Sequence, residues 1–157
     1  MTLRVQSARI NYGGPDRLDV TRKSGTDGLF LAPSWAILRP ALEARKWADG
    51  MMRVALDGIT ADAGNEYPEF DPFPYQSKAE NIIAQSWSSY VPAYLGEMRR
   101  SYVENRAQWS ALLARERVVL CCYCTDREHC HRAILRARIL PALGAVDDGE
   151  VQHAAQA

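Results

Sequence analysis

The sequence lacks any long hydrophobic run, since no stretch reaches about 18 consecutive apolar residues, the length that a membrane-spanning helix requires. Its first residues, Met1 to Arg4, also lack the apolar core of a secretory signal peptide. These two absences predict a cytoplasmic protein with no membrane partner.

The sequence also lacks an excess of either charge. Lys plus Arg and Asp plus Glu both number 19, which gives a formal net charge of +0. This balance argues against a protein built mainly to grip duplex DNA, because such proteins present a strongly basic surface.

Cysteine is scarce outside one segment. All four cysteines lie between Cys121 and Cys130, together with two of the three histidines nearby. A secreted disulfide framework would space its cysteines along the chain. The clustering therefore favours a reducing compartment and directs attention to residues 118–132 for chemistry.

The length of 157 residues is enough for one hydrophobic core without disulfide or metal support. We expect a single α/β domain over residues 1–145, followed by an acidic, flexible tail over residues 146–157. The expected architecture is a central, mostly parallel sheet flanked by helices, in a Rossmann-like three-layer arrangement.

Residues 118–124 form an apolar run without helical spacing, which predicts a buried strand. A polar turn follows, and residues 128–140 then favour a helix that Pro141 and Gly144 end. The helical pattern buries a stripe of Ala and Leu residues and leaves three arginines in water, namely Arg132, Arg136 and Arg138. Cys130 and His131 are thereby expected near a helix N-terminus, which favours an anion or a thiolate.

Earlier segments predict a strand at residues 4–10 and a further short strand at 52–59, where a helical end is also compatible. Residues 16–25 are predicted to be a short β-prone piece that runs into a polar, glycine-containing loop. A helix is expected from Ser34 as N-cap to residue 48, broken or restarted at Pro40. Residues 60–76 are predicted to be irregular, either as a binding lid or as a loop wrapped on the structure.

Residues 78–116 are predicted to be helical, with an interruption at Pro92. Two sets of large side chains are interpreted as core: Trp35, Leu38, Leu42 and Trp47 in the first helix, and Tyr90, Tyr94, Met98 and Tyr102 in the later one. The second set recurs every four residues and therefore shares one helix face.

Three interpretations compete for the Cys/His cluster. Zinc prefers Cys and His donors, so Cys122, Cys124 and Cys130 are candidate ligands, although their spacing differs from a Cys-x-x-Cys knuckle. Alternatively, Cys130 is a nucleophile whose pKa is lowered by the helix start and the neighbouring His131. In the third interpretation, the cysteines pack as small buried residues and His131 and Arg132 hold the helix or an anion.

A second polar group, Asp19, Arg22 and Ser24, follows the strand expected near residue 20. Ligands of α/β proteins usually bind at the carboxyl ends of strands. These residues are therefore candidates for ligand binding, and an ordinary solvated loop is the alternative.

The segment Leu120-Cys121-Cys122, followed by Asp126-Arg127-Glu128-His129-Cys130-His131-Arg132, resembles the signature of the bacterial and phage family called domain of unknown function 488. Members have a strand that ends in cysteine, a polar turn and His-Cys-His-Arg at a helix start. The segment from Asp19 to Ser24 resembles the family's early strand end less closely. Cys124 departs from the family pattern, in which many members have an acidic residue after the single cysteine.

The resemblance implies a compact α/β fold in which Asp19 and Arg22 lie near Cys122, Cys130, His131 and Arg132. It implies no established activity. From the residue types themselves we expect a ligand that carries phosphate, such as a nucleotide or a nucleic-acid end.

In this hypothesis Cys130, His131 and Asp19 are catalytic, as in a hydrolase or transferase, and Arg22, Ser24 and Arg132 bind the ligand. The alternative is a non-catalytic binding or accessory module whose Cys/His cluster is structural and holds zinc through Cys122, Cys124 and Cys130.

Overall fold

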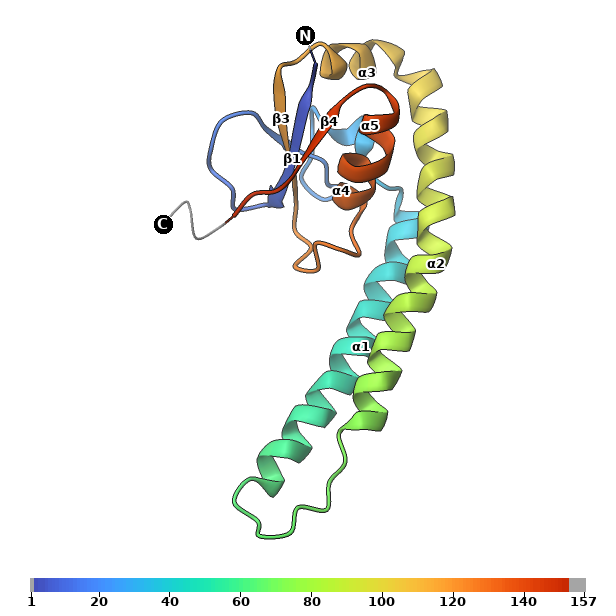
Figure 1. The fold of residues 1–157 in the computed structure, drawn as a ribbon. Coiled ribbons are helices and arrows are strands. Elements are labelled where there is room, and N and C mark those ends of the chain that lie inside the picture. Colours follow the sequence, from blue (N-terminus) through green and yellow to red (C-terminus); the bar gives the residue numbers. More distant parts are fainter. Residues whose placement is uncertain (1, 153–157) are drawn as a thin grey trace. The chain divides into compact units, whose positions relative to one another are not determined.

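The apolar run that ends at Cys122 forms the strand β3, Arg117–Cys122, of a four-stranded sheet. The computed structural model describes residues 2–152 (Figure 1). The other strands are β1 (Arg4–Arg9), β2 (Arg17–Asp19) and β4 (Val146–Glu150), in the order β2-β3-β1-β4. All three neighbouring pairs are parallel. An α/β fold with a parallel sheet is thus confirmed, whereas the three-layer Rossmann-like arrangement stays a prediction.

The central strand β3 is buried from Val118 to Cys122, as expected for a parallel strand covered on both faces. Its register sets Asp19 of β2 opposite Cys121, and Arg9 of β1 opposite Cys122. The carboxyl ends of β2 and β3 therefore lie at one edge of the sheet. This edge carries the candidate site.

Strand β4 corrects the expectation of a flexible tail from residue 146. The Val146 amide donates to the Leu3 carbonyl at 2.8 Å, and the Val151 amide donates to the Ser7 carbonyl at 2.8 Å. The two carbonyls belong to β1 and to the residue just before it, which are distant in sequence, so the acidic composition of the segment carries no sign of these hydrogen bonds. Residues 153–157 of the expected tail lie outside the described residues.

The chain divides into two compact units, one made of residues up to Ser34 and from Tyr94 onward, the other of residues 35–93. The second unit contains α1, Trp35–Asp62, and the first part of α2, Phe73–Glu104. Pro40 and Pro92 lie inside these helices, so the predicted breaks there are wrong. One proline removes a single backbone hydrogen bond, and the long helical segments on both sides outweigh that loss.

The strand predicted at residues 52–59 is also wrong, because these residues belong to α1. Met52, Leu56 and Ile59 recur at steps of four and three, which suits a helix as well as the local alternation suits a strand. The break expected at Pro92 occurs instead at Asn105, which precedes α3, Arg106–Leu113.

The two sets of side chains predicted to form the core differ in their burial. Trp35, Leu42 and Trp47 are 42%, 50% and 66% exposed, so their placement in the core is wrong. Helix α1 buries Ala48 and Ala55 instead. The later stripe is confirmed at Tyr90, Tyr94 and Met98, which are buried, while Tyr102 is half-buried against Trp109.

The segment between α1 and α2 is fastened to the helix ends. The Asp62 carboxylate accepts hydrogen bonds from the Phe70 amide at 2.6 Å and from the Asn65 side chain at 2.9 Å. The Phe70 ring stacks on Tyr75 and lies so close to Gly58 that a Cβ there would collide with it. These contacts are those of a loop wrapped onto its own helices.

The helix after β3 begins at His131, later than expected, because the Asp126 carboxylate accepts the Glu128 and His129 amides and holds a turn. It runs through α4 (His131–Ile134), the π-helical segment η2 (Leu135–Ile139) and α5 (Leu140–Ala142). Gly144, at φ +100°, follows it. Within residues 2–152, none of the helices is both long and apolar enough to cross a membrane.

Candidate functional site

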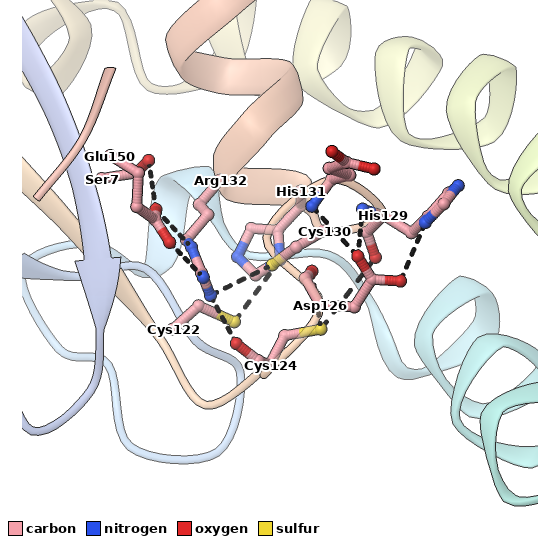
Figure 2. Close-up of polar contacts among 10 residues, drawn as sticks. Ser7, Cys122, Cys124, Asp126, His129, Cys130, His131, Arg132 and Glu150 are labelled. Carbon is pink, nitrogen blue, oxygen red and sulfur yellow. Dashed lines mark hydrogen bonds and ion pairs between the residues drawn. The ribbon is translucent and has the colours of Figure 1, made fainter. Parts of the chain in front are cut away.

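The end of β3 and the start of α4 bring three predicted residues together (Figure 2). Cys122 is the last residue of β3, Cys130 is the N-cap of α4, and His131 is the first residue of that helix. All three are buried, with 7%, 4% and 4% of their surfaces exposed. Their Sγ atoms and a ring nitrogen of His131 lie within 4.8 Å of one another.

A hydrogen bond fixes the orientation of the His131 ring. Its Nε2 lies 2.7 Å from the carbonyl oxygen of Val20. A carbonyl oxygen only accepts, so Nε2 carries the proton. In the neutral ring the Nδ1 lone pair therefore faces the Sγ atoms of Cys130 at 3.8 Å and Cys122 at 4.0 Å.

The two thiols have opposite ionisation tendencies. A hydrogen bond from the Cys130 thiol lowers the pKa of Cys122, and His131 lowers it further, against the opposing effect of burial. Burial raises the pKa of Cys130 well above its ordinary value, and the neighbouring sulfurs of Cys122 and Cys124 raise it further. The cluster therefore favours one thiolate, on Cys122.

Arg132 lies beside this cluster and is fully buried, so the expectation that it remains in water is wrong. Its Nε and Nη2 donate to the two carboxylate oxygens of Glu150 at 3.1 and 2.7 Å, and its Nη1 donates to the Cys124 carbonyl at 2.7 Å. Nη1 also lies 3.9 Å from the Cys130 Sγ. A bidentate pair with further hydrogen bonds is the arrangement that allows a guanidinium to be buried.

No local pattern around Glu150 indicates this role, because the residue lies in the segment expected to be an acidic tail. Its carboxylate also accepts the Ser7 hydroxyl at 2.6 Å. Burial opposes its ionisation, but the hydrogen bonds from Arg132 and Ser7 lower the pKa of Glu150 overall. Glu150 and the carbonyl of Val20 are the functional partners that sequence reasoning missed.

His129 and Cys124 form hydrogen bonds within the segment between β3 and α4, to which both belong. The His129 Nδ1 lies 2.8 Å from the Asp126 carboxylate, and the Cys124 thiol donates to the Asp126 carbonyl at 3.4 Å. Of the histidines near Cys130, therefore, only His131 faces Cys122. The fourth cysteine, Cys121, is fully buried, and burial raises the pKa of its thiol to about 11.

Asp19 ends β2 and organises the loop that follows. Its carboxylate accepts the Thr21 amide at 2.9 Å and the hydroxyls of Thr21 and Ser24 at 2.6 and 2.5 Å. Burial opposes ionisation, but these hydrogen bonds lower the pKa of Asp19 overall. Tyr123, next to Cys122, donates to the Ser24 hydroxyl at 2.9 Å. The Asp19 loop and the end of β3 are thus joined through Ser24.

Both arginines predicted to bind the ligand donate hydrogen bonds to protein groups. Arg22 donates through Nε to the Pro33 carbonyl at 3.0 Å and through Nη2 to the Ala32 carbonyl at 3.1 Å. Arg132 is held as described above. Ser24 is exposed and lies in the loop that follows β2.

The predicted metal set changes in composition. Cys122 and Cys130 meet as expected, but His131 joins them in the compact donor group instead of Cys124. Tetrahedral zinc with Zn–S of about 2.3 Å and Zn–N of about 2.0–2.1 Å needs donor separations of roughly 3.5–3.8 Å. The sulfur–nitrogen separations of 3.8 and 4.0 Å come close to that requirement, and the Val20 carbonyl supplies the outer partner that metal-bound histidines usually have.

Glu150 also lines a groove of about 400 Å³. It is lined by Arg127, Glu128, Ala133, Arg136, Glu150 and Gln152. Arg136 donates through Nη1 to Asp147 at 2.9 Å, whereas its Nε is buried and has no hydrogen-bond partner among residues 2–152. Glu150 pairs with Arg132 and Arg136 pairs with Asp147, so the remaining charges of the groove lining are those of Arg127 and Glu128.

Comparison with known proteins gives one result. Residues 41–142 match the family model DUF488-N3a, described as the active DUF488-N3 subclade. The match covers more than half of the chain and includes β3, the Cys/His cluster and the following helix. Neither the curated proteins nor the solved structures contain a match.

Proposed function

The chain belongs to the DUF488 family, and we propose that it is an enzyme that uses the Cys122 thiolate on a ligand carrying phosphate, such as a nucleotide or a nucleic-acid end. One observation carries the proposal: His131, fixed by Val20, directs Nδ1 at the Cys122 sulfur. The matched subclade is described as active, which favours catalysis over a purely structural cluster.

Each residue has a distinct role in this proposal. His131 Nδ1 accepts the proton of the Cys122 thiol, and the imidazolium that forms stabilises the thiolate. The thiolate attacks an electrophilic atom of the ligand and displaces the leaving group, and water or an acceptor then releases the covalent intermediate. Cys130 donates a hydrogen bond to the thiolate, while Arg132 and Glu150 hold the helix start in place.

The choice of Cys122 over Cys130 as nucleophile follows from the opposite pKa directions of the two thiols. The ionised carboxylate of Asp19 is a weak base. We therefore expect Asp19 to act by holding Ser24 beside Tyr123, at the carboxyl ends of β2 and β3. Because the single hydroxyl proton of Ser24 is donated to Asp19, Ser24 meets the ligand as a hydrogen-bond acceptor.

Arg127 and the Nε of Arg136, which has no hydrogen-bond partner within residues 2–152, support the choice of a ligand with phosphate. Arg132 has all three of its nitrogens engaged within the protein, and Arg22 has two. Guanidinium groups bind phosphate oxygens well. Through Glu150 and Arg132 the groove adjoins Cys130, whose sulfur is 3.9 Å from the Arg132 Nη1.

The thiolate is tested by alkylating chelator-treated protein across pH and locating the adduct by peptide mass spectrometry. We expect Cys122 to react with an apparent pKa below the reference of about 8.5, and Cys122→Ser to abolish that reaction. Cys121→Ser is the matched control, since Cys121 is buried with a raised pKa. A Cys122 that reacts only above the reference value would refute the nucleophile.

The phosphate ligand is tested separately by thermal shift with inorganic phosphate and with adenosine monophosphate. We expect stabilisation that Arg127→Ala removes, and that Arg138→Ala, an exposed arginine of η2 outside the groove, retains. Equal stabilisation of both variants would place the ligand elsewhere.

The compact donor set of Cys122, Cys130 and His131 favours a second candidate, a zinc centre. Zinc there would act structurally or as a Lewis acid. Metal analysis of protein purified without chelator decides between the two functions. Zinc that binds one ion per chain and is lost in Cys122→Ser and His131→Ala would establish the centre and exclude the free nucleophile.

A further inference from the structure

Three sulfur atoms gather between the end of β3 and the start of α4 (Figure 2). The Cys130 thiol donates a hydrogen bond to the Cys122 sulfur, and the Cys124 sulfur also lies beside Cys130. Cys122 and Cys130 belong to the group of donor atoms that lie within 4.8 Å of one another, and Cys124 is not part of that group. Cys122 and Cys130 are therefore the two thiols placed for a bond between their sulfur atoms.

The other two cysteines are directed elsewhere. Successive residues of a strand point to opposite faces of the sheet, and Cys121 packs with Val119 in a cluster on the face away from Cys122. Cys124 is directed toward the backbone of its own segment, where its thiol donates to a carbonyl oxygen at 3.4 Å. One pair thus remains, Cys122 with Cys130.

The segment that joins the two cysteines allows their sulfurs to approach further. A disulfide bond is shorter than the contact between two thiols, so some part of the chain has to adjust when the bond forms. Residues 123–130 form neither helix nor strand, and Cys130 precedes the helix as its N-cap with an extended backbone. The adjustment can therefore take place in this segment, without breaking the hydrogen bonds of β3 or α4.

We propose that Cys122 and Cys130 form a reversible disulfide when hydrogen peroxide oxidises the chain, and that this bond switches the site off. The bond itself follows from the positions of the two sulfurs. Only its regulatory effect rests on the proposed function, because the disulfide removes the Cys122 nucleophile. The same bond would also remove two ligands of a zinc centre.

The oxidation takes two steps. In the first, the Cys122 sulfur attacks one oxygen of the peroxide and the O–O bond breaks; the sulfur becomes a sulfenic acid, and the other oxygen leaves as water with the thiol proton. In the second, the Cys130 sulfur attacks the Cys122 sulfur and the S–O bond breaks, so that the hydroxyl group leaves as water with the Cys130 proton. The Nδ1 of His131, which lies 4.0 Å from Cys122 Sγ and 3.8 Å from Cys130 Sγ, is placed to carry both protons.

Cys122 reacts first because its sulfur accepts the hydrogen bond of the Cys130 thiol and is the more electron-rich of the two. Cys122 also keeps 7% of its surface exposed, and hydrogen peroxide is little larger than water. Cys130, which lies beneath it, is then the resolving thiol.

Peptide mapping of the full chain, treated with a chelator and then with hydrogen peroxide, tests the proposal. Trypsin cuts after Arg127 and so separates the peptide with Cys121, Cys122 and Cys124 from the peptide with Cys130. The disulfide therefore appears as two linked peptides that dithiothreitol releases, and fragmentation identifies the sulfurs. We expect the link to be lost in Cys122→Ser and to persist in Cys121→Ser and Cys124→Ser, which are matched controls on the same peptide.

Cys130→Ser provides a second measurement. Without the resolving thiol the sulfenic acid persists, so dimedone should label Cys122 in this variant and much less in the unaltered chain. Circular dichroism of each variant verifies that the fold is intact. Peroxide treatment that yields no linked peptides in the unaltered chain, or a link that survives Cys122→Ser, would overturn the proposal.

The outcome is distinguishable from failure of the proposed function. A Cys122 whose alkylation shows an ordinary pKa refutes the nucleophile and leaves the linked peptides in place. A Cys122 that is alkylated readily in a chain that never forms the link refutes only the disulfide. In the oxidised chain the alkylation of Cys122 should be lost and should return with dithiothreitol, and unchanged alkylation would overturn the switch.

Discussion

The His131 ring donates through Nε2 to the carbonyl oxygen of Val20, so the end of β2 determines which ring nitrogen faces the cysteines. The two residues are 111 positions apart in the chain. A histidine held in this way presents an unprotonated Nδ1 to Cys122 and Cys130, whichever of the two proposed chemistries operates there.

His131→Ala should raise the apparent pKa of Cys122 alkylation, because the imidazole both accepts the thiol proton and stabilises the thiolate. The pKa of Cys122 is lowered to about 4 in the folded chain, so the expected decrease in rate, about tenfold for each unit by which the pKa rises, is found at pH values below that pKa. His129→Ala is the control, since His129 pairs with Asp126. Rates are measured by mass spectrometry of the Cys122 peptide, and an unchanged rate in His131→Ala would show that the histidine does not activate the thiol.

Arg132→Met should destabilise the fold by about 3–5 kcal/mol, because it leaves the Glu150 carboxylate without its buried partner. The double variant Arg132→Met, Glu150→Met should recover part of that loss, since it removes both charges. Arg4→Met is the control: its pair with Asp148 is half exposed and is worth less than about 1 kcal/mol. Urea denaturation measures all three, and equal losses in the single and double variants would contradict the argument.

Stability should decrease in acid through Glu150. Its pKa is lower in the folded chain than its ordinary value, so the unfolded chain binds the proton more readily. The stabilisation by Glu150 is thus fully present above the unfolded pKa of about 4.3 and is lost as the pH falls through the folded pKa. The urea midpoint of Glu150→Gln, measured from pH 7 to 3, should fall less steeply than that of the unaltered chain; parallel curves would assign the acid sensitivity to other carboxylates.

Gly28→Ala should destabilise the protein by about 1–3 kcal/mol, because a Cβ at Gly28 would collide with the Asp19 carbonyl oxygen. Gly50→Ala provides the opposite case: Gly50 lies inside α1 with open space around it, and alanine should stabilise the helix by about 0.5–1 kcal/mol. Thermal unfolding distinguishes the two directions. A neutral Gly28→Ala would mean that the loop after β2 shifts without cost.

The buried strand at the sheet edge and the position of the Cys/His cluster could both be predicted from the amino-acid sequence. The apolar run before Cys122 specified a buried strand, and the Cys/His cluster marked the site, because both signals depend on neighbours within a few residues. The family resemblance, based on that cluster and the following helix start, is confirmed by the family match.

Which groups face one another at the site depends on how the strands pair in the fold. Glu150 reaches Arg132 because β4 pairs with β1, and the Val20 carbonyl reaches His131 because β2 lies beside β3. Such contacts join residues that are distant in sequence, and composition or periodicity carries no record of them. For the same reason the sequence placed Arg132 in water and Trp47 in the core: spacing identifies a helix, whereas burial depends on what the fold sets against each face.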